Sequence, residues 1–216
     1  MKNTGSATAQ EIAYMHELNA RLEKNPDDID ALLKKGIVSF TGFLRFDEAE
    51  EILKKVVTLC PNNVDALLWL GECLCFCIGN DFEAAQIMKT ALEIDPNRAD
   101  CHMVLAASLD GFDSNSSEAE IHYKKATELE PSWILPRKYL AKILFKRGLF
   151  QQALCELEKA LPYVPNVVAI KKDVDPIEEY YASFFTGLRD SEAKQKILDF
   201  IKRINATAAE KNDPTS

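Results

Sequence analysis

Prolines recur along the chain at an almost constant interval, and this regularity limits the fold more than any other feature. Pro26, Pro61, Pro96 and Pro131 are each 35 residues apart, and Pro165 follows after 34. A fixed period of this length is typical of chains that stack one supersecondary unit many times. The sequence therefore predicts that a single unit is repeated along most of the chain.

Each repeated unit contains two segments with helical periodicity. The segments that end at the later prolines are FDEAEEILKKVVTLCP, DFEAAQIMKTALEIDP, SSEAEIHYKKATELEP and FQQALCELEKALPYVP. Their apolar residues lie three and four positions apart, as on one face of an amphipathic helix, and the proline stops the helix. Another apolar-periodic segment precedes each, namely DALLKKGIVSF, DALLWLGECLCF, DCHMVLAASL and LPRKYLAKILF. The unit is therefore predicted to be helix, turn, helix.

This unit resembles the tetratricopeptide repeat, in which a small residue marks the first helix, alanines mark the second and a proline closes the repeat. The small position of the first helix holds Gly36, Gly71, Ala106 and Ala141. The two small positions of the second helix hold Ala49, Ala84, Ala119 and Ala153, then Val56, Ala91, Ala126 and Ala160. Lys35 and Val56 depart from the pattern, which covers roughly residues 29–165. The resemblance implies an all-α, right-handed superhelical solenoid of about four helix-turn-helix repeats with capping helices.

The domain organisation follows from this period. Residues 1–28 are predicted to form an N-terminal tail and a capping helix, and the repeats to occupy 29–63, 64–98, 99–133 and 134–166. Residues 167–207 are predicted to hold C-terminal helices, one containing YYASFF and one with Ile197, Ile201 and Ile204 on one side, and 208–216 to be a disordered tail. The first three repeats are one residue longer than the fourth, and we expect the extra residue in the turn between the two helices.

Composition excludes several classes of partner. The chain has 216 residues and a formal net charge of −8, which disfavours non-specific binding to nucleic acid or to an anionic membrane surface. The N-terminal segment MKNTGSATAQEIAYM has no apolar run of signal-peptide length, and nowhere in the sequence is an apolar run long enough to span a bilayer. We therefore expect no nucleic-acid binding, no membrane insertion and a cytoplasmic location.

The resemblance places the candidate binding site on the concave surface, which the first helices line. Counting from each repeat start predicts an unusually apolar groove with aromatic anchors for an extended or helical segment of a protein partner. The candidate protein-binding residues are Leu33, Ile37, Phe40, Leu68, Trp69, Glu72, Phe76, Met103, Tyr139, Lys142 and Phe145. In an alternative hypothesis, the chain fills this groove with its own C-terminal YYASFF segment, or tight curvature of the array buries these residues.

Charged residues refine the choice of partner. Tetratricopeptide proteins that hold the terminal carboxylate of a heat-shock chaperone use several converging Lys, Asn and Arg donors, but here apolar residues and Asp100 occupy those positions, which makes that partner unlikely. Asp30, Asp65 and Asp100 form a ladder, explained either by helix N-termini or by an acidic rim that attracts a basic partner. Lys138, Lys142 and Lys146 give the fourth repeat the opposite sign.

No catalytic, cofactor or metal site is predicted. His16, His102 and His122 have no partnered nucleophile in the sequence and are interpreted as packing or surface residues, and neither a phosphate-binding glycine loop nor HExxH occurs. Cys73, Cys75 and Cys77 alternate along WLGECLCFCI. On a helix Cys75 would point away from the other two, so the three thiols do not converge on a metal, and Cys73 and Cys77 are interpreted as small apolar fillers.

These observations favour a non-enzymatic protein-interaction scaffold or client chaperone that buries an apolar segment of a partner in its groove. Two alternatives stay open: a structural subunit of a larger assembly that uses its convex surface or ends, and a secretion-type chaperone.

Overall fold

The computed structural model describes residues 9–112, 117–163 and 201–202, and every regular element within them is helical. The α-helices are α1 (Ala9–Lys24), α2 (Ile29–Thr41), α3 (Phe46–Leu59), α4 (Val64–Cys73), α5 (Asp81–Ile94), α6 (Ala99–Phe112), α7 (Ser117–Leu129), α8 (Ile134–Lys146) and α9 (Phe150–Ala160). A π-helical turn, η1 (Leu74–Ile78), extends α4, and a short 3-10 turn, η2 (Leu161–Tyr163), follows α9. The all-α prediction is confirmed.

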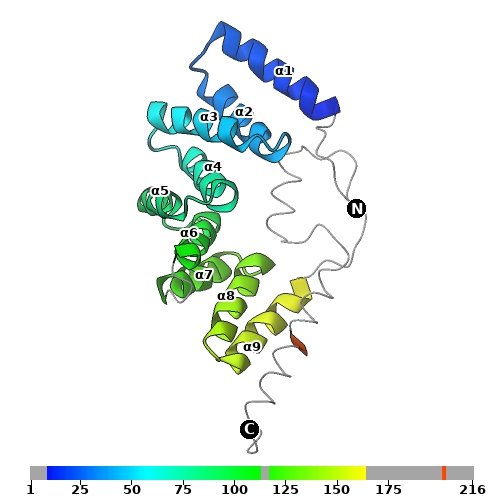
Figure 1. The fold of residues 1–216 in the computed structure, drawn as a ribbon, viewed down its shortest axis with the longest axis vertical. Coiled ribbons are helices and arrows are strands. Elements are labelled where there is room, and N and C mark those ends of the chain that lie inside the picture. Colours follow the sequence, from blue (N-terminus) through cyan, green and yellow to red (C-terminus); the bar gives the residue numbers. More distant parts are fainter. Residues whose placement is uncertain (1–8, 113–116, 164–200, 203–216) are drawn as a thin grey trace, which may run out of the picture.

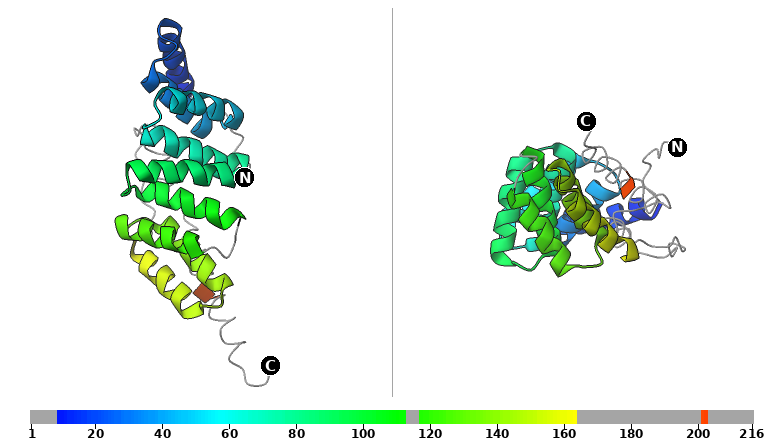
Figure 2. Two further views of the ribbon diagram at one scale, coloured as in Figure 1. Left: turned by 90° about the vertical axis from the view of Figure 1, so that its left-hand side faces the viewer. Right: turned by 90° about the horizontal axis from the view of Figure 1, so that it is seen from below.

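The helices form a curved array in which consecutive helices pack side by side from α1 to α9 (Figures 1 and 2). The first helices of the repeats, α2, α4, α6 and α8, begin 35 residues apart. First helices of adjacent repeats also contact one another, α2 with α4 and α4 with α6. Helices α4 and α6 therefore pack against second helices on two sides and against neighbouring first helices, which leaves them little free surface.

Small residues make this close packing possible. A Cβ atom added to Gly36 would lie 2.9 Å from the Leu53 side chain, and one added to Gly71 would lie 2.5 Å from Cε of Met88. Ala106 and Ala141 occupy the same place in their repeats and are completely buried. Larger side chains here would push the second helix of the repeat outward.

Both ends of the array carry additional contacts. Helix α1 packs against α2 and buries Met15 and Leu18, while Ile12 remains exposed. Ile201, predicted to face inward, packs against the main apolar core of the repeats. The other predicted C-terminal segments, including YYASFF and the tail 208–216, lie outside the described residues. Among the described helices, none combines the length and apolar composition that crossing a bilayer requires.

In the first two repeats, the extra residue is absorbed at the end of the first helix rather than in the connection that follows. Leu44, Gly79 and Gly148 occupy equivalent positions and all have a positive φ, of 53°, 78° and 76°. The backbone amide of the residue after each of these positions closes the last turn of the first helix. In the fourth repeat Leu149 donates to the carbonyl of Leu144, five residues earlier. In the first two repeats Arg45 and Asn80 donate six residues back, to the carbonyls of Ser39 and Leu74. One widened turn, seen as η1 in the second repeat, thus accommodates the insertion.

Leu44 is the exception among these positive-φ residues, because the Cβ atom of a leucine is sterically strained in this conformation and glycine has no Cβ atom. Its side chain is exposed and gains little from burial. Leu44→Gly is therefore expected to raise the free energy of unfolding by about 0.5–1 kcal/mol, measured by urea denaturation.

Leu149 provides the matched control, since it is an exposed leucine in the equivalent connection of the fourth repeat without a positive φ. Leu149→Gly should lower stability by about 0.5–1 kcal/mol through the entropy of the unfolded chain. Equal effects at the two positions would contradict the strain at Leu44.

Candidate protein-binding surface

Most of the predicted groove residues are buried. Six of the eleven candidates have at most a few per cent of their surface exposed: Ile37, Phe40, Leu68, Trp69, Glu72 and Met103. Leu33, Tyr139 and Phe145 are half-buried, and Phe76 and Lys142 are exposed. The predicted apolar groove is thus mainly interior, and the surface that its residues offer to a partner is much smaller than the sequence pattern suggested.

Aromatic packing accounts for part of this burial. The ring of Trp69 meets the ring of Phe40 edge-on, with centroids 5.9 Å apart, and Phe40 meets Phe46 at the same distance. These rings belong to an apolar cluster shared by the first two repeats, which also includes Ile37 and Leu53. Leu68 and Met103 lie in the larger core that continues through the third and fourth repeats. These side chains hold adjacent repeats together.

The three cysteines of the second repeat differ in how deeply they are buried. Cys73 is fully buried as expected, but Cys77 is exposed on the widened turn η1, so its interpretation as an apolar filler is wrong. Burial raises the pKa of Cys73 and Cys75 to about 12, which keeps both thiols protonated at neutral pH. Within the described ranges, no three His, Cys, Asp or Glu side chains are grouped so that they could hold a metal ion.

Apart from Phe76 on η1 and the half-buried Leu33 on α2, the accessible part of the candidate site lies on α8. We define the α8 surface as Lys138, Tyr139, Lys142 and Phe145. Tyr139 stacks on the buried Tyr123 with ring planes 7° apart and centroids separated by 5.7 Å. Lys138 Nζ and Lys142 Nζ lie 5.9 and 5.7 Å from the Tyr139 ring centroid. A fixed aromatic ring flanked by two ammonium groups can hold an apolar group and a carboxylate together.

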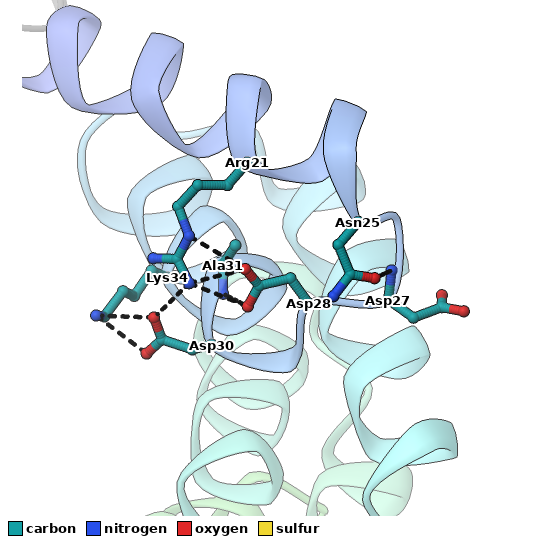
Figure 3. A network of polar contacts seen from close by, with 7 residues as sticks. All are labelled: Arg21, Asn25, Asp27, Asp28, Asp30, Ala31 and Lys34. Atoms are coloured by element: carbon teal, nitrogen blue, oxygen red, sulfur yellow. Dashed lines mark hydrogen bonds and ion pairs between the residues drawn. The ribbon is translucent and has the colours of Figure 1, made fainter.

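The aspartate ladder is neutralised by neighbouring cations. Asp28 and Asp30 both accept from Arg21 of α1, and Asp30 also pairs with Lys34 (Figure 3). The hydrogen bond from Lys34, followed by that from Arg21, lowers the pKa of the Asp30 carboxyl. The ladder therefore does not present a row of bare carboxylates to a basic partner.

Arg98 neutralises the two later members of the ladder. It bridges Asp65 and Asp100, with Nη1 2.9 Å from Asp65 Oδ1 and Nη2 2.7 Å from Asp100 Oδ2. The hydrogen bonds to Asp100 are the main reason why the pKa of Arg98 is raised. Asp100 also accepts the backbone amide of Cys101 at the start of α6, as the helix-terminus explanation requires.

The structure brings together two histidines that the sequence had not paired. Nδ1 of His102, on α6, lies 2.9 Å from Nδ1 of His122, on α7. The two residues are 20 positions apart, so their contact depends on how α6 crosses α7 and no local spacing reveals it.

Comparisons with known proteins agree with this fold. A family model described as tetratricopeptide repeat matches residues 45–107, and no curated protein sequence matches the chain. Among solved structures, MamA has a TM-score of 0.64 at 22% identity and covers 76% of this chain and 95% of its own. Yeast Tom70 has a TM-score of 0.68 at 15% identity, covering 93% of this chain and 38% of its own. YrrB, described as a TPR protein with an unusual peptide-binding site, has a TM-score of 0.59 at 18% identity and covers 73% and 79%.

The family model and the solved structures agree with the helical repeat fold described above. Residues 45–107 therefore match the tetratricopeptide repeat in sequence, and the wider likeness to MamA shows that the chain shares the fold of that solved structure.

Proposed function

We propose that the chain is a non-enzymatic protein-interaction scaffold that binds a segment of a partner protein at the α8 surface and at Phe76. The observation that carries this proposal is the half-buried Tyr139 ring, stacked on Tyr123 and flanked by Lys138 and Lys142. Stacking fixes the ring before binding, so little conformational entropy is lost when a partner packs against it. Peptide binding is also the property named for the similar protein YrrB.

The chemistry of the α8 surface favours a segment that combines an apolar or aromatic residue with a carboxylate. Tyr139 and Phe145 supply apolar contact area, and Lys142 supplies a positive charge. Lys142 Nζ lies 4.0 Å from Asp110, at the long limit for an ion pair, so it can turn towards a ligand at small cost. A client-chaperone role would use the same surface for an unfolded segment. All six cysteines are free thiols, which suits a reducing compartment such as the cytosol.

A structural role in a larger assembly is the second candidate, and two exposed side chains favour it. Phe82 at the start of α5 is 69% exposed, and Ile121 on α7 is 63% exposed. Both lie on second helices, α5 and α7, and neither belongs to the α8 surface. A secretion-type chaperone would be a special case of segment binding and would use the α8 surface.

Capture of partners from the native cell, quantified by mass spectrometry, distinguishes the two candidates. Tyr139→Ala combined with Lys142→Glu is expected to reduce the recovery of the main partner at least about tenfold, because an aromatic anchor and a charge contact are both lost. Phe82→Ser combined with Ile121→Ser is the matched control and should leave recovery unchanged. Circular dichroism confirms that both variants fold. Loss of capture in the control pair alone would contradict the proposal and support the assembly role.

A further inference from the structure

The His102–His122 pair has a defined geometry between α6 and α7. The rings stack with centroids 5.1 Å apart and planes inclined by 26°. On its other side His102 Nε2 lies 3.1 Å from the carbonyl oxygen of Pro96, in the connection between α5 and α6. His102 is buried and His122 is half-buried. The pair therefore ties the α5–α6 connection to both helices of the third repeat.

The contacts determine where the protons lie. The carbonyl of Pro96 can only accept, so His102 must carry its proton on Nε2. In the neutral ring this leaves a lone pair on Nδ1, and His122 must donate its Nδ1 proton to it. The line between the two Nδ1 atoms has room for one proton. Protonation of both rings places two N–H groups against each other and breaks this hydrogen bond.

The surroundings also disfavour two positive rings. Burial lowers the pKa of both histidines, and the neighbouring His102 lowers that of His122 further. Lys125 of α7 and Lys89 of α5 add positive charge near His102 and His122, respectively. The hydrogen bond to the Pro96 carbonyl raises the pKa of His102, but burial is the larger effect and the net shift is downward. Asp100 of α6 and Glu118 of α7 also raise the pKa of His102 and His122, respectively, but Arg98 and Lys89 already pair with these carboxylates.

We propose that the His102–His122 pair is an acid-sensitive joint between α6 and α7, the two helices of the third repeat, closed while the rings are neutral and opened when both are protonated. Opening loosens α6 against α7, while His102 keeps its Nε2 proton and its hydrogen bond to the Pro96 carbonyl. The proton linkage has a definite sign. Folding lowers the pKa of both groups below the unfolded value of about 6.5. The contribution of the two neutral histidines to the stability of the folded chain is therefore fully present above that pH and is lost as the pH falls below it.

Urea denaturation between pH 7.5 and pH 5 tests the joint. The unfolding equilibrium constant of the unaltered chain is expected to rise about tenfold or more over this range, beyond the rise that other groups cause. The variant His102→Gln/His122→Gln should lack this additional rise. His16→Gln, which replaces the exposed histidine of α1, is the control and should behave as the unaltered chain does. Equal pH profiles for the double variant and the unaltered chain would overturn the proposal.

Nitrogen-15 NMR of the imidazole rings provides a second test that needs no variant to fold. At pH 7.5 His102 should be protonated at Nε2 and His122 at Nδ1. On acidification both rings should titrate below about 6.5 and with mutual dependence. Nε2 protonation in both rings, or two independent titrations near 6.5, would show that the joint does not exist.

Discussion

Trp69→Ala is expected to lower the free energy of unfolding by about 3–5 kcal/mol, the range typical of a large aromatic side chain removed from a core. Trp69 is 1% exposed and packs edge-on against Phe40 in the cluster shared by the first two repeats. Its loss leaves a cavity at the junction between repeats, and the rigid helices on both sides can collapse only partly into it.

The measurement is urea denaturation followed by the fluorescence of Trp133, the other tryptophan, and by circular dichroism. Phe76→Ala is the control, because Phe76 is 41% exposed and its truncation should cost less than about 1 kcal/mol. A repeat array can unfold in parts, so differing transitions from the two probes would report uncoupling of the repeats. A cost at Trp69 as small as that at Phe76 would show that Trp69 does not hold the repeats together.

Arg98→Ala is the other large expected effect, a loss of about 2–4 kcal/mol. The substitution removes the cation from Asp100, whose side chain is 8% exposed, and leaves a buried carboxylate with only the Cys101 amide as a described hydrogen-bond donor. Asp65 is more than half exposed and can be solvated by water, so its share of the loss is small.

Two further variants isolate this effect in thermal or urea denaturation. Arg98→Ala/Asp100→Asn should recover much of the stability, because a neutral amide no longer needs a counter-charge. Arg45→Ala removes an arginine from its exposed ion pair with Glu48 and should cost less than about 0.5 kcal/mol. If Arg98→Ala were as mild as Arg45→Ala, the bridge between Asp65 and Asp100 would contribute nothing to stability.

The repeat architecture could be predicted from the sequence because its determinants are local and periodic. Proline stops a helix wherever it occurs, and apolar residues three and four apart define a helix face without knowledge of the neighbours. Gly36 and Gly71 were recognisable as close-approach positions, and each faces a buried side chain of the following helix. These features need no information from distant parts of the chain.

The binding surface was less predictable, because burial depends on contacts between elements. Trp69 and Tyr139 occupy equivalent positions, 70 residues apart, yet Trp69 is enclosed and Tyr139 is half-exposed. An apolar residue that faces a groove and one that faces the next repeat have the same helical spacing. The pairing of His102 with His122 likewise depends on the crossing of two helices. The repeat pattern also did not predict that Arg98 pairs with both Asp65 and Asp100 and so joins two repeats.

The widened turn at the end of α4 has a consequence for how such sequences are compared. A residue inserted in a loop changes only the loop, but one absorbed within a helical turn rotates every following side chain of that turn by about 100°. Cys77 and Phe76 lie on the widened turn of the second repeat, and both are exposed. An alignment that opens its gap at Gly79 would match these residues to the wrong positions of a 34-residue repeat. Placing the gap one turn earlier aligns these residues correctly. The extra residue is then read as a change in the direction of the side chains that follow it, rather than as a longer loop.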